Sequence, residues 1–479
     1  MKRKFVTNLA LLLFLNLLVK PFWIFGIDRT VQNIVGAGEY GFYFSLLNFS
    51  LILNVILDIG VTNYNNRNIS QHSFLLSKYL SNIIILKFIL AVAYAIISIG
   101  LALLIGYDSR QLHLLFLLIF NQFLISFTLF LRSNISGLQL FRTDSFLSVL
   151  DKALMIVFCS ALLWGRATGS VLKIEHFVYA QTAAYLISTF AIFLIVQKHT
   201  GVIKYNFNIK YILAIVKQTM PYALLVLIMA SYSRIDSVLL ERMLVNGTEQ
   251  AGIYAQAFRI LDAASMFGFL FAALLLPMFS KMIKIKEPVN QLVQLSTLLI
   301  LVPVLLFSIS SLFYKTEIMG MLYNEHVQTS STIFALLMFS FVSISVTYIF
   351  GTLLTANGNL KQLNIIAASG LLINVVMNIV LIPKLSATGS AYASLFTQTV
   401  TAFAQLYFAC RVFGFKINYP LIFKIFGFIL FVFVINYLSL YLTCFWVIKF
   451  VIVLASGFII AFISRLISLK NIYRIVFDS

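Results

Sequence analysis

The sequence predicts an all-α polytopic membrane protein with about 14 transmembrane helices, arranged as two six-helix lobes plus two appended C-terminal helices. Composition excludes a water-soluble fold: 61% of the 479 residues are apolar and only 10% are charged, whereas roughly 25% of a soluble domain is charged. The mean hydropathy is +1.00. Fourteen separate apolar windows of about 20 residues, each long enough to cross roughly 30 Å of hydrocarbon, give the helix count.

The predicted spans follow one another with short polar loops. The first lobe takes 6–27, 40–63, 79–105, 112–131, 145–165 and 176–197. The second lobe takes 218–240, 250–280, 292–313, 328–354, 363–382 and 387–410, and the appended pair is 421–441 and 445–464. The first segment is interrupted at Lys20-Pro21, and no small-residue cleavage site follows it. We therefore interpret it as a span and not as a signal peptide.

Lysine and arginine outside the spans predict the orientation. With a cytoplasmic N-terminus, twenty-one of these residues fall on the cytoplasmic side and seven on the other. Positive residues concentrate in cytoplasmic loops, so both termini are predicted to be cytoplasmic. Most of the net charge of +19 is then explained by topology, and a nucleic-acid partner is not predicted.

Short matching segments indicate an internal duplication of six spans. The pairs are 39–43 with 250–254, 179–181 with 392–394, and 136–137 with 357–358, at offsets near 211 to 221. They occur in the same order and at equivalent span positions. An even-numbered unit repeats in the same orientation, which predicts two lobes related by an axis along the membrane normal, with a cavity between them.

The duplication sets the predicted domain boundaries. Residues 1–197 form the first lobe, 198–217 a cytoplasmic linker, 218–411 the second lobe, and 412–479 the appended helices and a cytoplasmic tail. Lys204, Lys210 and Lys217 alternate with apolar residues in the linker. This pattern predicts an amphipathic helix on the inner membrane surface.

Several motifs together resemble the Wzx-type flippases for O-antigen and capsule repeat units, over about residues 1–411. They are Val35-Gly36, Glu39-Tyr40-Gly41-Phe42-Tyr43, Asp58-Ile59-Gly60, Arg234-Ile235-Asp236, Gly252-Ile253-Tyr254-Ala255 with Arg259, Leu275-Leu276-Pro277, and Asn374, Asn378 and Pro383 followed by Gly389-Ser390-Ala391. This family belongs to a superfamily with the lipid II flippases and the MATE exporters. Lys20-Pro21 and Asp28-Arg29 stand where lipid II flippases would carry a set of arginines.

The resemblance implies a function and a location. A member would move an undecaprenyl-pyrophosphate-linked oligosaccharide from the cytoplasmic to the periplasmic leaflet of a bacterial inner membrane by alternating access. Coupling to H⁺ or Na⁺ is implied, without another cofactor. Implied partners are the lipid-linked substrate, membrane lipids, and other assembly proteins such as a polymerase and glycosyltransferases.

Charged residues inside the spans are the candidate site residues, because a charge at a helix centre costs at least about 2.5 kcal/mol unless it faces a cavity or a partner. The predicted cations of the substrate cavity are Arg259, Arg234 and Lys20, and the predicted coupling or structural acids are Asp262, Asp236 and Asp58. Further candidates are Arg29, Asp28, Lys87, Asn374 and Asn378. Guanidinium groups bind phosphate in a bidentate fashion, and the spacing of Arg259 and Asp262 places them on one helix face.

Other interpretations of these residues stay open. Arg234 can snorkel toward the membrane surface, Arg259 can form a purely structural pair with Asp262, and Lys87 is better interpreted as structural. A MATE-like exporter of small amphiphiles is the alternative function. A membrane-embedded glycan ligase or polymerase is disfavoured because the outer loops are short, and no catalytic, phosphate-binding or metal-binding motif occurs.

Overall fold

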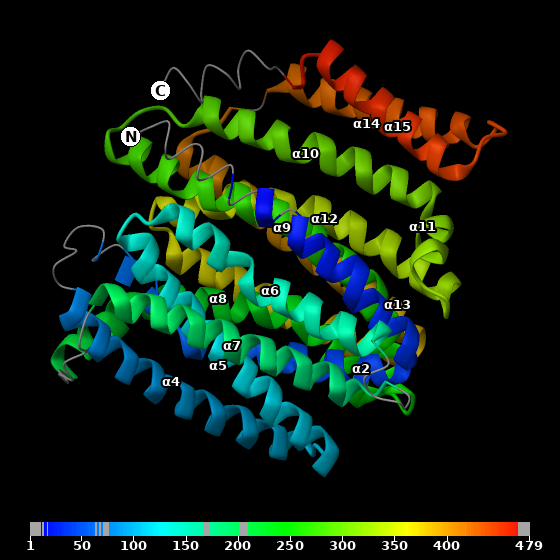
Figure 1. The fold of residues 1–479 in the computed structure, drawn as a ribbon. Helices are drawn as coiled ribbons and strands as arrows, with labels where there is room; N and C mark the ends of the chain where they lie inside the picture. The colour runs from blue at the N-terminus through cyan, green and yellow to red at the C-terminus, as the bar shows by residue number, and fades with distance from the viewer. Residues whose placement is uncertain are drawn as a thin grey trace. The chain divides into compact units, whose positions relative to one another are not determined.

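The computed structural model describes residues 11, 14–16, 18–62, 65–66, 69, 76–165, 172–200, 209–416 and 418–467, and the side chains of these residues except 76–79, 200, 209–215 and 218–219. All regular structure in the described residues is helical. The chain divides into two compact units, residues 1–252 and 253–479. Figure 1 traces the helices along the chain.

In the part of the first unit that the structure describes, the helical elements with defined bounds run from η1 to the first turns of α9. They are η1 (Phe22–Asp28), α2 (Arg29–Leu53), η2 (Asn54–Leu57), α4 (Leu76–Ile105), α5 (Ser109–Gly137), α6 (Phe141–Trp164), α7 (Ile174–Thr200), α8 (Ile209–Met243) and the first turns of α9 (Gly247–Lys284). Helix α5 packs between α2 and α7, α6 packs on α7, and α2 also packs on α8. The first turns of α8 include residues 209–217 of the predicted linker, whereas 201–208 lie outside the described residues.

The second unit contains the rest of α9 and six further helices. They are α10 (Asn290–Phe313), α11 (Lys315–Leu322), α12 (Val327–Ala356), α13 (Leu360–Phe413), α14 (Tyr419–Ser439) and α15 (Trp446–Ile463). The pair α14 and α15 packs on α10 around a shared apolar core (Figure 1). Gly457 allows this close approach, because a Cβ atom there would collide with the side chain of Leu306.

Helices α2 and α13 each contain a reversal of the chain at a single non-helical residue, so that each forms part of a helical hairpin. The backbone breaks at Gly36 (φ 80°) and at Ser386 (φ 50°). The Tyr40 hydroxyl donates a 2.7 Å hydrogen bond to Asp28, and the Ser390 hydroxyl donates a 2.8 Å bond to Asn378. Residues twelve apart in a straight helix are about 18 Å apart, so the chain reverses at both breaks.

These reversals give the predicted number of spans. Twelve helices in the described residues are long and apolar enough to cross a membrane, and they include Phe14–Leu57 and Leu360–Phe413, which contain the two hairpins. Counting each hairpin as two spans gives fourteen. The helix bounds follow the predicted spans within several residues, and the all-α membrane fold is confirmed.

Span 2 differs from the prediction at its end. The regular helix stops at Leu53 and tightens into η2, and the chain then turns through Asp58, with positive φ at Ile59 and Gly60. The Asp58 carboxylate accepts a hydrogen bond from the backbone N–H of Thr62 at 3.2 Å, across this turn. The apolar run hides this break because a local hydrogen bond leaves hydropathy almost unchanged.

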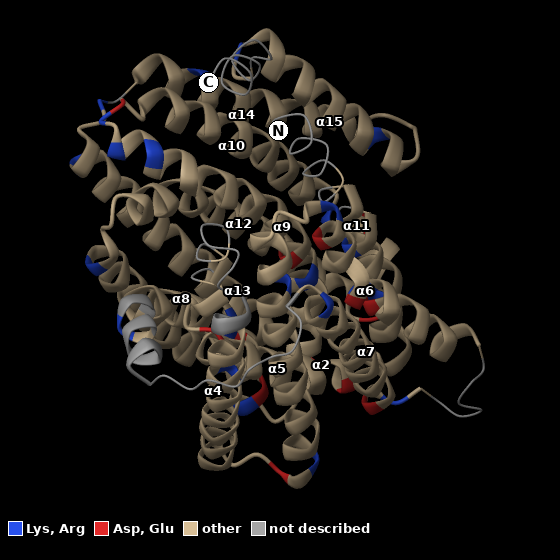
Figure 2. Ribbon diagram, turned by 60° about the vertical axis from the view of Figure 1, so that its left-hand side comes forward, with Lys and Arg blue, Asp and Glu red and all other residues tan. Residues whose placement is uncertain are grey.

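Charged residues are sparse along the helices and gather at a few places (Figure 2). Large apolar side chains instead cover much of the exposed surface, including Phe88, Ile96 and Leu104 of α4. A membrane protein exposes such a surface to lipid, where it costs nothing. Buried charges are therefore the features of this fold that need an explanation.

Candidate functional site

Three cations inside the first unit lie close together, and one of them is Lys20. The charged groups that act electrostatically on Lys20 are Asp151, Lys152 and Arg132. Arg132 belongs to α5, while Asp151 and Lys152 lie near the middle of α6. We call Lys20, Arg132, Lys152, Asp144 and Asp151 the basic cluster. It contains three cations and two carboxylates.

Two cations of the basic cluster are held by partners. The Arg132 Nε atom donates a 2.9 Å hydrogen bond to Asp144 Oδ1. The Lys152 Nζ atom donates to the Tyr185 hydroxyl at 3.0 Å and forms an ion pair with Asp151 at 3.4 Å. Both pairs lie mostly below the surface, with exposed side-chain fractions of 12 to 23%. Each carboxylate is thus already paired with a cation.

Aromatic rings complete the surroundings of Lys152. Its ammonium lies 5.0 Å from the Tyr185 ring centroid and 5.7 Å from that of Trp23, distances at which a ring face attracts a cation. Trp23 belongs to η1, a π-helix that follows Pro21. Proline lacks the N–H that an α-helical turn would use, and π-helical turns are frequent at functional sites.

Lys20 is the partly buried cation of the basic cluster that belongs to neither of these two ion pairs. Among the described residues, its ammonium takes part in no hydrogen bond or ion pair. The excess positive charge of the basic cluster is therefore concentrated at Lys20, in the middle of the first span. Lys20 shares the attraction of Asp151 with Lys152, so an anionic group arriving at Lys20 would supply the negative charge that the basic cluster lacks.

Arg234 and Asp236, the predicted charges of span 7, lie on different sides of α8. The Arg234 Nη1 atom donates a 2.9 Å hydrogen bond to Asn48 Oδ1 on α2. The Asp236 side chain is fully buried. The contact with Asn48 joins α8 to α2 and orients the Arg234 guanidinium.

Arg259 and Asp262 lie on one face of α9 in the second unit, as their spacing predicts. The distance from Arg259 Nη1 to Asp262 Oδ2 is 3.9 Å, and the side chains are 16% and 22% exposed. This separation is longer than a charge-assisted hydrogen bond. At this distance the two side chains form an ion pair.

Asp28 is buried in the first unit and accepts the hydrogen bond from the Tyr40 hydroxyl described above. This bond crosses the reversal at Gly36 and holds spans 1 and 2 together. Arg29 follows it at the start of α2 and is half-buried. Neither residue belongs to the basic cluster.

Lys87 and Asp58 form a buried structural pair. The Lys87 side chain is 1% exposed and contacts the Asp58 carboxylate directly. Its ammonium also donates to the Leu57 carbonyl and the Ser126 hydroxyl, each at 3.0 Å. Lys87 thus donates to a backbone carbonyl at the end of η2.

Asn374 and Asn378 hold the α13 hairpin together. Both side chains are fully buried. The Asn378 Nδ2 atom donates to the Asn374 carbonyl at 2.9 Å, and its Oδ1 atom accepts the bond from Ser390 on the other arm. Both asparagines therefore take part in the hydrogen bonds that join the two arms of the hairpin.

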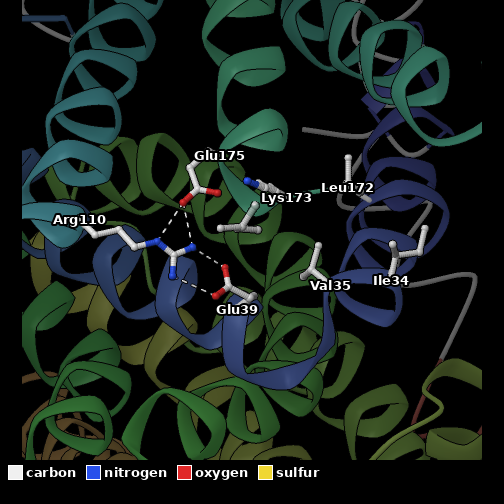
Figure 3. A pocket seen from close by; sticks show the side chains of 8 residues that line it. Ile34, Val35, Glu39, Arg110, Leu172, Lys173 and Glu175 are labelled. Carbon is white, nitrogen blue, oxygen red and sulfur yellow. Dashed lines mark hydrogen bonds and ion pairs between the residues drawn. The ribbon is translucent and has the colours of Figure 1, made fainter. Parts of the chain in front are cut away.

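A second group of charged residues, which the sequence analysis did not select, surrounds Arg110 at the start of α5. The Arg110 guanidinium donates to both carboxylate oxygens of Glu39, at 3.0 and 2.6 Å, and to Glu175 Oε1, at 2.8 and 3.0 Å. It also lies 4.5 Å from the centroid of the Phe42 ring. Figure 3 shows Arg110 between the two carboxylates. Arg110 and Glu175 lie in the first turns of α5 and α7, and Glu39 lies just after the break in α2. The predicted topology places all three helix starts on the same side.

A cavity of about 410 Å³ opens beside this group and is lined by Ile34, Val35, Glu39, Arg110, Leu172, Lys173, Ile174 and Glu175 (Figure 3). Its charges balance, with two carboxylates and two cations. Within the described residues, no cluster of His, Cys, Asp and Glu suits a metal ion. The basic cluster, with its excess positive charge, is therefore the better candidate for an anionic ligand.

Sequence reasoning missed most of the basic cluster. It selected Lys20 but none of the other four residues of the basic cluster. A signal was available, since Lys152 lies near the middle of its span beside Asp151. Its contact with Tyr185 depends on the packing of α6 against α7, which the sequence alone does not provide.

The fold and these buried charges define a class, the polytopic membrane transport proteins built from two helical lobes. The chain belongs to the family described as polysaccharide biosynthesis protein, whose model matches residues 7–283. This membership and the fold confirm the resemblance to Wzx-type flippases. No curated protein matches the chain in a direct search.

Solved structures of transporters share the fold. The lipid II flippase MurJ, in an inward closed conformation, matches with a TM-score of 0.72 and 16% identity, covering 98% of this chain and 99% of that one. An inward-facing multidrug resistance MATE family transporter of the MOP superfamily matches with a TM-score of 0.59, 13% identity, and coverage of 85% and 98%. A MOP superfamily transporter from Pyrococcus furiosus, whose binding pocket has reverse polarity, matches with a TM-score of 0.58, 14% identity, and coverage of 85% and 93%.

Proposed function

We propose that this protein flips an undecaprenyl-pyrophosphate-linked oligosaccharide from the cytoplasmic to the periplasmic leaflet of a bacterial inner membrane. Family membership supports a role in polysaccharide biosynthesis, and the fold is one that transporters use. The observation that carries the proposal is the excess positive charge at Lys20 inside the first span.

The chemistry of the substrate fits this arrangement. A glycan has many hydroxyl groups and does not cross hydrocarbon unaided, because each unsatisfied polar group costs several kcal/mol there. The pyrophosphate adds negative charge that needs a counterion. Lys20 supplies one such charge, and Arg259 supplies a fork suited to phosphate oxygens. The lipid tail can stay in the bilayer while the head group crosses.

Acidic residues offer a route for ion coupling. We propose that Asp262 holds Arg259 when no substrate is bound and releases it when substrate arrives or when Asp262 is protonated. The 3.9 Å separation between their side chains supports an exchangeable pair. Asp28 is the second candidate, since it is buried in span 1 and bound to Tyr40. H⁺ and Na⁺ are both compatible with a carboxylate.

A deletion strain tests the transport role. Without the protein, surface polysaccharide should fall while the lipid-linked unit accumulates on the inner leaflet. Absence of the lipid-linked unit would instead indicate an enzyme of its synthesis, and export of cationic amphiphiles with normal polysaccharide would favour a MATE-like exporter. Glycan transfer by the purified protein would favour a ligase or polymerase.

Variants of Lys20 test the site. Lys20→Gln removes the charge with little change in size and should abolish complementation, whereas Lys20→Arg should retain part of it. Lys424→Gln is the matched control, because Lys424 lies on the exposed surface of α14. Full complementation by Lys20→Gln, at equal membrane abundance, would remove Lys20 from the site.

A further inference from the structure

Two copies of one short sequence pattern contact each other in the first unit. Residues 36–43 and 247–254 both read Gly, four residues, Gly, one residue, Tyr. Gly41 lies against the first turn of α9, where a Cβ atom would overlap the Thr248 carbonyl oxygen. Gly252 lies against the start of the second arm of α2, where a Cβ atom would overlap the Ala37 carbonyl oxygen.

The two contacts are equivalent under the offset of the internal duplication. Adding 211 to Gly41 gives Gly252, and adding 211 to Ala37 gives position 248. Each copy thus places its glycine against the same position of the other copy. Such reciprocity is the property of a two-fold interface. It also means that backbone meets backbone, as in the close packing of membrane helices through glycine.

Three further interactions join residues that precede the predicted linker to residues that follow it. The Gln32 side chain donates a 3.0 Å hydrogen bond to the Gly252 carbonyl. Gln111 donates to Glu241 at 2.8 Å and accepts from Arg242 at 2.7 Å, which ties α5 to the end of α8.

The Arg242 guanidinium also lies 4.3 Å from the centroid of the Tyr107 ring. Tyr107 lies in the loop between α4 and α5, and burial raises the pKa of its phenol, so the ring stays neutral beneath Arg242. Residues of the predicted first lobe (1–197) therefore contact both the end of α8 and the start of α9.

We propose that these contacts form a self-complementary outer latch. The latch consists of the glycine contact between 37–41 and 248–252 together with the tie of Gln111 to Glu241 and Arg242. On the predicted topology its segments lie on the non-cytoplasmic side, so the closed latch seals that side. It separates once in each transport cycle to release the glycan, and the glycines let it close again. Only the separation of the latch to release the glycan rests on the proposed function.

Glycine substitutions test the contact, with a matched control on the same segment. Gly41→Ala and Gly252→Ala each add a methyl group that collides with a backbone carbonyl, whereas a methyl group at Gly38 meets nothing within 4 Å. In a background without Cys159, Cys410 and Cys444, the buried Ala37→Cys should react several-fold faster with an impermeant thiol reagent added outside when Gly252→Ala is present. Gly38→Ala should leave the labelling rate unchanged.

A reversible cross-link tests the latch without depending on how the glycine variants fold. Gln111→Cys with Arg242→Cys, joined by a short bis-methanethiosulfonate, should lose transport and recover it on reduction. Arg110→Cys with Glu175→Cys is the control, because that pair joins α5 to α7 within one repeat. Its cross-link should leave transport at the uncross-linked rate.

The outcomes separate the latch from the proposed function. Unchanged Ala37→Cys labelling in Gly252→Ala, or full transport by the cross-linked Gln111 and Arg242 pair, would overturn the latch. If no variant moves a lipid-linked oligosaccharide but labelling still responds to Gly252→Ala, the latch stands and the substrate is a different one.

Discussion

Replacing Lys87 should destabilise the protein without removing its transport activity. Lys87→Met keeps the length of the side chain but removes the charge that neutralises Asp58 and the donor to Ser126. Removing one partner of a buried ion pair costs about 3 to 5 kcal/mol. Asp58 is 32% exposed, so water compensates in part. We therefore expect a loss near the lower limit, about 3 kcal/mol.

The assay is thermal unfolding of the purified protein in detergent. A loss of about 3 kcal/mol should lower the midpoint by about 6 °C or more for a cooperative unit of this size. Lys87→Met combined with Asp58→Asn should recover part of the loss, because asparagine can also accept the hydrogen bond from Thr62 and leaves no unpaired charge. Transport per folded molecule should stay at the wild-type level. An undiminished midpoint with lost transport would show that Lys87 contacts cargo.

The remaining predictions concern the second unit and the topology. Arg259→Ala should abolish complementation while Arg259→Lys retains part of it, and wild-type polysaccharide from Arg259→Ala would exclude this arginine. Asp262→Asn should be milder, with a defect that changes with pH if protonation drives release. Ser390→Ala removes one buried hydrogen bond between the two arms of the α13 hairpin and should cost about 1 kcal/mol in thermal unfolding. A cysteine at Tyr205 should resist an impermeant reagent from outside, and labelling there would contradict the predicted topology.

The helices could be predicted from the sequence because hydrocarbon thickness dictates their length. The reversal near Ser386 was placed correctly between spans 11 and 12 because Pro383 and small residues interrupt the apolar run. Hydropathy did not reveal the break after Leu53, where the chain turns through Asp58. Local hydrogen bonds, and not hydropathy, determine where this helix ends.

The candidate site was predictable only in part. A charge in an apolar run, such as Lys20 or Arg259, is visible in the sequence. Its neighbours are not, because Lys152 meets Trp23 only through the packing of separate spans. The repeated pattern around Gly41 was visible as well, but its contact with the other copy required the structure.

Transbilayer movement of the substrate is the most direct test of the proposed function. The purified protein, reconstituted into vesicles that carry an undecaprenyl-pyrophosphate-linked oligosaccharide in the inner leaflet, should expose the glycan to a glycosidase added outside. Lys20→Gln vesicles, with equal amounts of folded protein, should expose it no faster than protein-free vesicles. Equal exposure with wild-type protein and without protein, or undiminished exposure with Lys20→Gln, would contradict the account.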